Sequence, residues 1–527
     1  MYFILLGPAT AALLYILVKA IYSAFFHPLA KYPGPFISKF TFARASYHAW
    51  KGDIHLDMWK CDYVRYGPNQ LLVNTPAGVR DIYGARSHSK FLKSKHYDIM
   101  SHQAANTFTH RGGKDHLRRR RIMAQGFSGQ AQREYEPRIA AHVDKFCRIV
   151  LPEDHGAWSE PLNMSKWCNY LSFDMMADII FGAHYDLLGN ERFRYVPEMI
   201  EKNNVRMAAL VQFPGLSWLR LDKHLFPEAI WARNRFLNFV MRLVKDRMEL
   251  SKGNVCGIYG KRTATRSATS TAPQKLSDVY SRLELARDPE TGGEFQPHEI
   301  ASESTTLVVA GSDTSACTIA SVLFYLADNP VAYAKVAEEV RAKVSSRSDI
   351  TAANLSSCVY LRACIDEALR MSPAVGSALV REVVSSAGTT VDGQFLPAGM
   401  EVGVGTYAIH HNSQCFSDPF TYRPERWLET HAARESIDRA RSVLIPFSTG
   451  IRSCLGKGLA YTEITLVMAT LMFLGDFKFA DGPLGRLGRG TEGGEYGRHR
   501  ENEYQLRDHI AGQKNGPWLQ FSRRESY

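Results

Sequence analysis

Several patterns that would assign this chain to a common class are missing. Its nine cysteines are odd in number and scattered, and none belongs to a C-x-x-C pair. This distribution argues against a disulfide framework or a structural zinc site, and it favours a reducing compartment. No internal repeat is visible, which argues against a solenoid or a propeller. Residues 1–18 carry no basic side chain and no A-x-A-like site follows Lys19, so a cleaved signal peptide is disfavoured.

The chain is long and mildly basic. Its 527 residues allow one large core or two to four ordinary domains, and the net charge of +11 is spread over the whole length. Such a charge suits nucleic acid, an anionic membrane or an acidic protein partner. One dense basic run, Arg118 to Arg121, could be a nuclear localisation or nucleic-acid patch, but a different role is favoured below.

The N-terminal segment is apolar from Tyr2 to Phe26, broken only by Lys19. About 20 apolar residues cross a bilayer, so we expect an uncleaved transmembrane anchor over residues 1–26. Lysines and arginines follow the span, which leaves the remainder of the chain on the cytosolic side. The three prolines and one glycine between Pro28 and Pro35 predict a stiff, non-helical hinge over residues 27–40.

The remainder, residues 41–527, reads as one domain that is mainly α with a small β portion. Apolar periodicity predicts helices over 115–125, 160–182, 225–251, 298–328, 330–346, 359–371 and 455–475. Short apolar runs among Gly, Asp and Pro predict strands and turns between residues 376 and 408. Residues 252–275 read as a polar surface loop, and residues 482–500 as an irregular Gly- and Arg-rich stretch.

Cys454 lies in a segment suited to presenting a thiolate. Gly450 and Gly456 permit a tight loop and close approach to a flat cofactor, Phe447 offers an aromatic wall, and Arg452 is a nearby cation. A predicted helix begins directly afterwards, and its N-terminal amides favour a negative sulfur. A lone cysteine is more often a small buried apolar residue. This spacing instead favours a soft ligand for iron.

Ala310, Gly311, Asp313 and Thr314 interrupt the apolar helix predicted over 298–328. A glycine in mid-helix costs about 1 kcal/mol against alanine, which suggests that space is needed beside it. An acid and an alcohol side by side suit proton delivery to dioxygen. The alternative is a buried polar cluster that caps or kinks the helix.

Glu367 and Arg370 share one face of the helix predicted over 359–371, where they can form an ion pair. Taken alone, this is an ordinary surface bridge. A further arginine, Arg426, lies in the Pro-bounded aromatic turn Tyr422–Trp427.

His116 and Arg120 are four residues apart, so they share a face of the helix predicted over 115–125. The other arginines of the basic run point elsewhere on this helix. Together with Lys457 they are expected to form either a basic patch for an acidic redox partner or a plain solvated face.

These segments, in this order, resemble the cytochrome P-450 family over essentially the whole chain. The resemblance implies the cytochrome P-450 fold after a transmembrane helix, with Cys454 as the axial iron ligand. His116 stands where the family usually carries tryptophan, and Ile451 where many relatives carry proline. The resemblance implies catalytic roles for Asp313 and Thr314, structural roles for Glu367, Arg370 and Arg426, and cofactor contacts by Arg452, Arg120, His116, Arg381, Phe447 and Gly456.

The implied activity is that of a haem-thiolate monooxygenase that uses haem b, O₂ and NADPH-derived electrons. The implied partners are NADPH–cytochrome P-450 reductase, with cytochrome b5 as a second candidate, a membrane and no nucleic acid. The hinge and the segment Asp288–Gly292 resemble those of fungal microsomal members in sequence, which implies single-pass anchoring in the endoplasmic reticulum. It also implies a lipophilic substrate of secondary metabolism, such as a terpenoid, polyketide or alkaloid.

Two alternatives on the same fold stay open. They are a haem-thiolate isomerase or dehydratase without net oxygen insertion, and a non-enzymatic haem-binding protein. The implied substrate walls are residues 91–110, residues 205–220 with Phe213 and Trp218, Leu307, Ala310, and residues 374–379.

Overall fold

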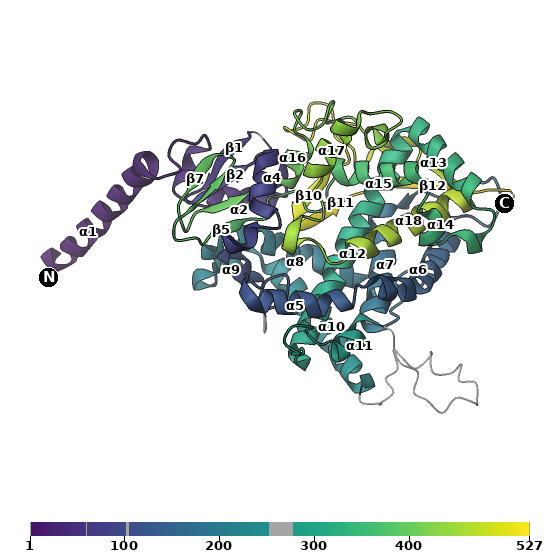
Figure 1. Cartoon of the computed structure of the whole chain (residues 1–527), viewed down its shortest axis with the longest axis horizontal. Coiled ribbons are helices and arrows are strands. Elements are labelled where there is room, and N and C mark those ends of the chain that lie inside the picture. The colour runs from purple at the N-terminus through teal and green to yellow at the C-terminus, as the bar shows by residue number, and fades with distance from the viewer. Residues whose placement is uncertain (1, 60, 102–104, 252–277, 526–527) are drawn as a thin grey trace.

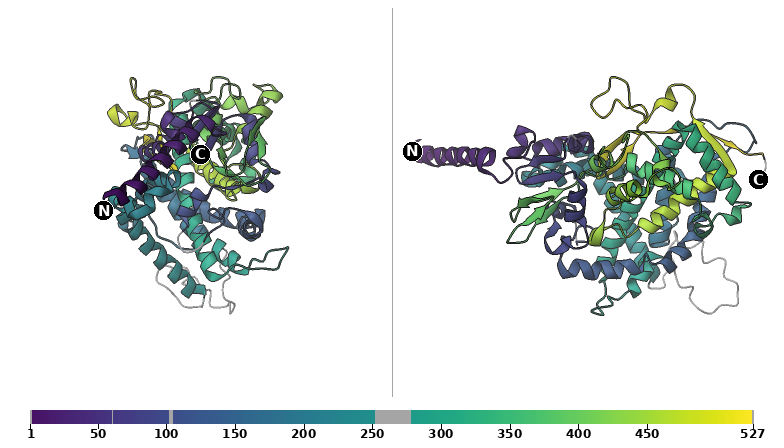
Figure 2. Two further views of the ribbon diagram at one scale, coloured as in Figure 1. Left: turned by 90° about the vertical axis from the view of Figure 1, so that its left-hand side faces the viewer. Right: turned by 45° about the horizontal axis from the view of Figure 1, so that its top comes forward.

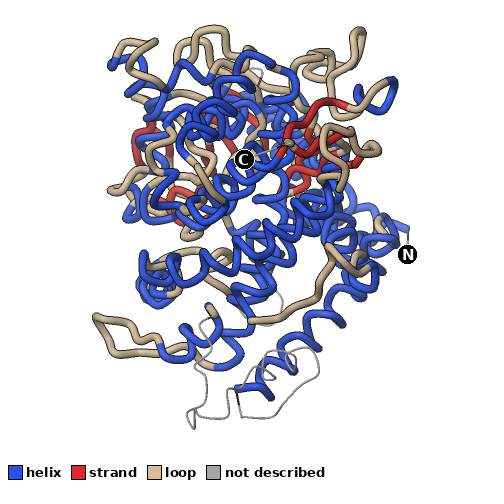
Figure 3. The backbone as a smooth tube through the Cα atoms, turned by 90° about the vertical axis from the view of Figure 1, so that its right-hand side faces the viewer, coloured by secondary structure: helices blue, strands red, loops and turns tan. Residues whose placement is uncertain are grey.

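The computed structural model describes residues 2–59, 61–101, 105–251 and 278–525 of the chain. Helices make up most of the body and strands a smaller part of it (Figure 3). The expected mainly α fold with a small β portion is therefore confirmed. The loop predicted over 252–275 lies entirely outside the described residues, so its conformation stays a prediction.

All seven predicted helices are present, with ends that lie close to the expected ones. Apolar side chains recur at helical spacing in these segments, and the ends carry recognisable signals. Before the longest helix, for example, Gln296 and Glu299 form a reciprocal capping box. The seven helices are α5 (Gly113–Gln125), α7 (Met164–Phe181), α10 (Pro227–Ser251), α12 (Pro297–Asp328), α13 (Pro330–Lys343), α15 (Val359–Met371) and α18 (Lys457–Leu474).

Two long helices were not predicted, α6 (Gly129–Val150) and α8 (Tyr195–Gln212). α6 contains Pro137, a residue that usually ends a helix, although the buried side chains on either side of it keep helical spacing. Tertiary packing decides the outcome in both segments. The shorter helices are α2 (Ala43–Lys51), α3 (Ile54–Met58), α4 (Pro76–Tyr83), α9 (Leu221–Leu225), α11 (Val279–Leu285), α14 (Ala352–Leu355), α16 (Thr406–His410) and α17 (Arg434–Val443).

The main sheet has five strands in the order β1-β2-β8-β5-β3, and it lies near the end of the body that carries the N-terminal helix (Figure 1). β2 and β8 pair in parallel, and the other neighbours are antiparallel. Four strands fall within the predicted region 376–408, as expected. The strands named so far are β1 (Tyr63–Gly67), β2 (Gln70–Val73), β3 (Phe91–Lys93), β5 (Arg381–Val383) and β8 (Glu401–Gly403), to which β6 (Thr389–Val391) and β7 (Gln394–Leu396) add a hairpin.

Smaller sheets close the C-terminal part of the chain. β12 pairs with both β4 and β9, and β10 pairs with β11. Between β9 and β10, residues 482–500 form turns and one short 3-10 helix, in agreement with the predicted irregular stretch. These strands are β4 (Leu162–Asn163), β9 (Gly475–Phe479), β10 (Leu506–His509), β11 (Ala511–Lys514) and β12 (Trp518–Arg523).

α12 runs through the helical part of the body, where it packs along α7 and against α15 and α18. By length and apolar composition, α12 and α18 could each cross a membrane, but 72% and 61% of their most apolar windows are buried inside the protein. They are therefore helices of the protein core. This core provides the rigid frame on which the site described below is built.

The N-terminal helix α1 (Tyr2–Ile21) projects away from the body, as the right-hand view of Figure 2 shows. Its end is fastened to the sheet, because the buried Arg65 of β1 donates a hydrogen bond to the carbonyl of Ser23 over 2.8 Å. The Arg65 amide also donates to the carbonyl of Pro33 over 2.7 Å. Residues on both sides of the predicted start of the hinge are thus hydrogen-bonded to β1.

Candidate functional site

The loop that carries Cys454 lies between a 3-10 turn at Gly450–Arg452 and the first residue of α18, Lys457. Gly450 has a φ of 67°, and a Cβ there would lie 2.2 Å from the carbonyl oxygen of Tyr83, so only glycine fits. Gly456 has an ordinary φ of −82°, and a Cβ there would lie 3.9 Å from Cys454 Sγ. Its φ therefore does not require glycine, and the expected close approach to a flat cofactor stays a prediction.

The Cys454 thiol lies within the protein but faces open space. Its backbone amide donates to the carbonyl of Phe447 over 2.8 Å, which closes the loop. The side chain is accessible although protein surrounds it, which is the behaviour of a group on the wall of an internal space. Burial raises the pKa of the thiol. The backbone amides of Gly456 and Lys457 and the charges of Arg120 and Lys457 oppose that rise.

Arg120 and Arg452, both expected to contact the cofactor, have different partners within the protein. Arg120, on α5, donates to the carbonyl of Ser453 over 2.8 Å and to its hydroxyl over 3.1 Å, so Arg120 supports the residue next to the thiol. Arg452 turns away and donates to the carbonyl of His110 over 2.8 Å and to that of Arg111. The cations that act on the Cys454 thiol are therefore Arg120 and Lys457, and not Arg452.

Four buried or half-buried basic side chains, which we call the cationic cradle, line one cavity: Lys93, His116, Arg381 and Arg452. Across the described parts of the chain, none of the four forms a salt bridge. Their visible acceptors are backbone carbonyls, such as that of Phe108 for Lys93 and that of Leu379 for Arg381. The cavity is completed by Ile82, Tyr83, Ser87, His88, Phe91, Leu92, Gly112, Gly113, Leu117 and Ile451.

The mutual repulsion of these groups is visible in their acid–base behaviour. Burial, together with the charges of Arg452 and Lys93, lowers the pKa of His116 to about 2. Burial and the charges of Arg381 and Arg452 also hold the pKa of Lys93 well below its usual value. Buried cations without acids need an anion beside them. A haem, with an iron for the Cys454 thiolate and two carboxylates for the cradle, fits this set of donors.

α12 opens to space at only part of its length. Ala310 is exposed and Thr314 is half-exposed, whereas most of the residues that follow are buried. The Thr314 hydroxyl donates to the carbonyl of Ala310 over 2.7 Å. Gly311 faces the other way, because a Cβ there would lie 2.3 Å from the terminal methyl of Met176 on α7. The glycine therefore allows close packing of α7, and the expected space for a cofactor lies beside Ala310.

Asp313 and Thr314 use different partners. The Asp313 carboxylate accepts a hydrogen bond of 3.1 Å from the amide of Asn204 on α8. Burial first, and then the charge of Glu201, raises the pKa of Asp313 to about 7. Glu201 accepts from Asn169 over 2.8 Å, and Lys514 donates to Asn169 over 2.6 Å. Asn169 thus joins Glu201 and Lys514, two charged groups that act on the pKa of Asp313.

Glu367 is fully buried and its carboxylate is completely occupied, an arrangement that we call the arginine brace. Arg370 donates to it over 2.8 and 3.0 Å, and Arg426 over 2.9 Å. The amide of Arg423 and the indole of Trp427 each donate over 3.0 Å. Burial raises the pKa of Glu367, but the two arginines outweigh that effect and the net pKa is lowered.

The arginine brace reaches the cysteine loop through His410, a residue that no sequence signal indicated. Arg370 donates to the carbonyl of His410 over 2.9 Å, and the His410 Nε2 accepts from the amide of Ile445 over 2.9 Å. Ile445 lies two residues before Phe447. Burial lowers the pKa of His410 to about 3, so the imidazole stays neutral and can accept.

The expected basic patch on α5 is wrong for its three arginines. Arg119 is buried and pairs with Asp115, Glu299 and Glu303. Further pairs join Arg118 to Asp115 and Glu299, and Arg121 to Asp288 and Glu290. Because acids within the chain neutralise these charges, neither a free patch nor a plain solvated face describes them. Lys457 is exposed.

The expected substrate walls are partly corrected. Trp218 is 74% exposed on the surface, so it cannot line an internal pocket. The loop before α5 is instead fastened to α12, because Asn106 donates to Thr306 over 2.8 Å and Thr107 donates twice to Glu303 over 2.7 Å. Burial raises the pKa of Glu303 to about 7. Sequence reasoning missed this tether, because its members share no motif.

The sequence of this chain is similar to a known protein family and to several fungal proteins. The family model described as Cytochrome P450 matches residues 63–484. The chain is 43% identical to cytochrome P450 monooxygenase AKT7 of Alternaria alternata over 97% of its own length and 95% of the relative's. It is 42% identical to cytochrome P450 monooxygenase poxM of Penicillium oxalicum, over 98% and 96%. Cytochrome P450 monooxygenase atnE of Emericella nidulans is 38% identical, over 94% and 92%.

Proposed function

Since the chain belongs to the cytochrome P450 family and is a haem-thiolate monooxygenase, we propose that Cys454 is the thiolate ligand of its haem iron. One observation carries this proposal. The thiol faces internal space at the start of α18, and a cavity beside the same loop holds four basic groups without acids. Both features are accounted for by a single cofactor with one metal and two carboxylates.

Each remaining residue of the site then has a role that its contacts support. Arg381, Arg452 and His116 bind the propionates, with Lys93 as a further donor in the same cavity. Arg120 holds Ser453 and stabilises the thiolate charge. Phe447 and Gly456 border the thiol, whereas Glu367, Arg370 and Arg426 hold the loop in place without touching the reacting atoms.

The haem supplies, when bound, the activation of O₂ and the insertion of one oxygen atom into the substrate. Asp313 supplies protons. Its pKa of about 7 leaves part of its carboxyl protonated at neutral pH. To reach Thr314, the carboxyl leaves Asn204 and turns about its own side chain. We propose that the proton is restored through Glu201, Asn169 and Lys514, since the charges of Glu201 and Lys514 act on Asp313.

The substrate is a lipophilic small molecule that lies beside Ala310 and Leu307 on α12. The tether between Asn106 and Thr306 sets one polar edge of this space. Apolar walls bind apolar ligands, and a few polar groups fix their orientation. We infer a role in fungal secondary metabolism, on a terpenoid, polyketide or alkaloid skeleton.

A membrane location follows from the projecting helix. We propose that residues 1–26 anchor the chain in the endoplasmic reticulum, that residues 27–40 form the hinge, and that residues 41–527 form the cytosolic domain. α9 lies at the end of the body from which α1 leaves (Figure 1), and Trp218, Leu219 and Leu225 expose large apolar side chains there. Electrons come from NADPH through a reductase on the same membrane, with cytochrome b5 as a second donor.

The first experiment tests the ligand. Purified Cys454→Ser protein is expected to lose the carbon-monoxide band that marks thiolate-ligated ferrous haem, whereas the matched Cys61→Ser variant keeps it. An unchanged band in Cys454→Ser would rule out this ligand. Spectral titration with candidate metabolites, followed by mass spectrometry of products formed with a reductase and NADPH, identifies the substrate. A product without added oxygen would favour an isomerase or dehydratase.

The second experiment tests Asp313. Because the protonated fraction falls as the pH rises through about 7, wild-type product formation is expected to decline above that pH. Asp313→Asn removes the titrating group, so its rate is expected to be about 100-fold lower and to show no such decline. An Asp313→Asn enzyme that kept the wild-type rate and pH profile would exclude Asp313 as the proton donor.

A further inference from the structure

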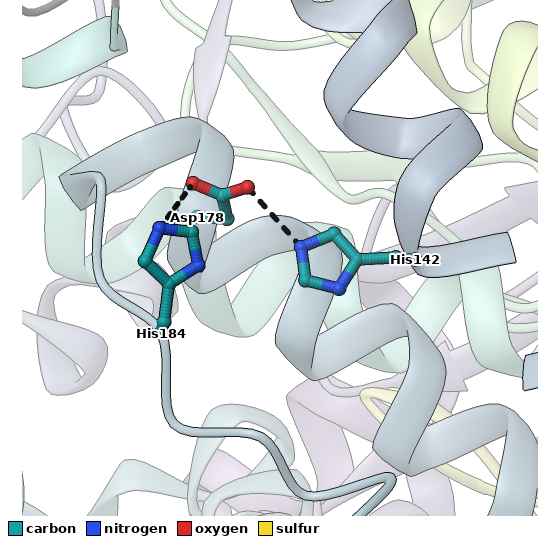
Figure 4. A group of neighbouring side chains, drawn as sticks. All are labelled: His142, Asp178 and His184. Carbon is teal, nitrogen blue, oxygen red and sulfur yellow. Dashed lines mark hydrogen bonds and ion pairs between the residues drawn. The ribbon is translucent and has the colours of Figure 1, made fainter. Parts of the chain in front are cut away.

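A second cluster of metal-ligating side chains lies on α6, α7 and the residues after α7. His142, Asp178 and His184 converge there (Figure 4), and their ligand atoms all lie within 4.8 Å of one another. His142 Nε2 is 3.1 Å from one Asp178 carboxylate oxygen, and His184 Nε2 is 3.7 Å from the other. None of these residues takes part in the haem site described above.

The local fold holds the three side chains in place. His142 projects from α6 and Asp178 from the last turn of α7, two helices that pack against each other. Gly182 ends α7 with a φ of 69°, a left-handed conformation that reverses the chain and returns His184 onto Asp178. The amide of Gly182 donates to the carbonyl of Asp178 over 2.7 Å, which fixes this turn.

Asp178 is prepared as an anionic ligand. It is only 2% exposed, and the guanidinium of Arg138 donates to its carboxylate. Arg138 donates to the carboxylate oxygen nearer to His184, and His142 Nε2 lies 3.1 Å from the other oxygen. Ligating carboxylates are commonly held by such an outer hydrogen bond.

We propose that His142, Asp178 and His184 bind one first-row transition-metal dication, of which Zn²⁺ is the simplest probe. Two imidazole nitrogens and one carboxylate oxygen form a donor set that suits Zn²⁺, Cu²⁺ and Ni²⁺. In a tetrahedral zinc site, bond lengths of about 2.0–2.2 Å place ligand atoms roughly 3.3–3.5 Å apart. The separation of 3.1 Å between His142 Nε2 and one carboxylate oxygen lies near that range, and all three ligand atoms lie within 4.8 Å of one another, so small side-chain movements would close the site around a metal.

The site is open to solvent on one side, which gives the metal an entry path. The side chains of His142 and His184 are 17% and 34% exposed, so water can complete the coordination. The metal would join the end of α7 to α6. Since α7 packs along α12 and α6 packs against α18, this bond would stiffen the helical frame without contacting the haem.

The test uses the full haem-loaded protein, because free Cys454 in haem-free chains would itself bind zinc. After treatment with a chelator, Zn²⁺ is titrated by calorimetry and Co²⁺ by its visible ligand-field bands. Wild type is expected to bind one equivalent and to gain thermal stability with added Zn²⁺. His184→Ala and His142→Ala are each expected to weaken binding at least about 10-fold. His224→Ala removes an exposed histidine far from the cluster and serves as the matched control.

Three results overturn the proposal. One is the absence of a stoichiometric site in wild type. Another is equal Zn²⁺ affinity in wild type and in His184→Ala, where folding is checked by an unchanged haem spectrum. The third is a Co²⁺ spectrum without nitrogen ligation. In each case the cluster is a hydrogen-bonded tie between two histidines and a carboxylate.

Discussion

The arginine brace and the cationic cradle are two groups of basic side chains within the same protein, and they differ in what balances their charge. In the brace, Arg370 and Arg426 enclose the carboxylate of Glu367, whose two oxygens accept five hydrogen bonds in all. In the cradle, Arg381 and Arg452 have backbone carbonyls as their visible acceptors, and burial and neighbouring charges lower the pKa of Arg452.

This difference in charge balance indicates that the brace stabilises the fold and that the cradle binds a ligand. A charge network that is complete within the chain stabilises the fold, because every buried donor and acceptor is matched. A network that lacks its anions costs stability until a ligand supplies them. The two clusters contain the same residue type, so the presence of arginine alone could not distinguish them. What distinguishes the two clusters is whether acids within the chain balance their arginines.

The largest effect is expected from breaking the brace. Glu367→Ala leaves two buried guanidinium groups without their acid, which should cost about 3–5 kcal/mol in free energy of unfolding and abolish haem incorporation. Urea unfolding and the haem content of the purified protein measure both effects. Glu429→Ala removes an exposed glutamate and should behave like wild type. Normal haem content in Glu367→Ala would show that the brace is not needed for the site.

A smaller effect is expected from breaking the cradle, and it should appear in haem affinity and not in the stability of the haem-free protein. Arg381→Met removes one of several mutually repelling cations, so the haem-free protein should be no less stable than wild type. The same change should weaken haem binding by about 2 kcal/mol, roughly 30-fold, because a propionate loses a buried partner. Haem transfer to apomyoglobin measures the affinity. Equal losses of stability with and without haem would make the cradle a second structural brace.

The sequence predicted those residues of the brace and the cradle that belong to short local motifs. Glu367 and Arg370 share a helix face, and Cys454 has a distinctive spacing of neighbours, so local patterns sufficed for them. Lys93 and His410 carry no such pattern, because they meet their partners only after distant segments pack together. The basic run on α5 misled for the same reason. Besides the nearby Asp115, the acids that neutralise it include Asp288 and Glu299, which lie more than 160 residues away.

The fold was predictable to a similar extent. Helices with a continuous apolar face were predicted close to their actual ends, whereas α6 was missed because Pro137 interrupts an otherwise regular pattern. The exposure of Trp218 could not be predicted from its identity, since a large aromatic residue is equally compatible with a pocket wall and with an outer apolar surface.

The smallest effect concerns the pH dependence of the cradle without haem. Burial and the charges of Arg381 and Arg452 lower the pKa of Lys93 in the folded protein below its unfolded value. Between the folded pKa and about 10.5, the unfolded chain then binds more protons, so the stability of the haem-free protein should rise with pH in that window. The rise is expected to vanish in Lys93→Met. Haem loading should also abolish this rise in stability, because propionates beside Lys93 favour its charged form.

Urea unfolding across this pH range, with the exposed Lys90→Met as control, measures the effect. A rise that persisted in Lys93→Met would mean that another group is responsible and that Lys93 does not belong to the incomplete network.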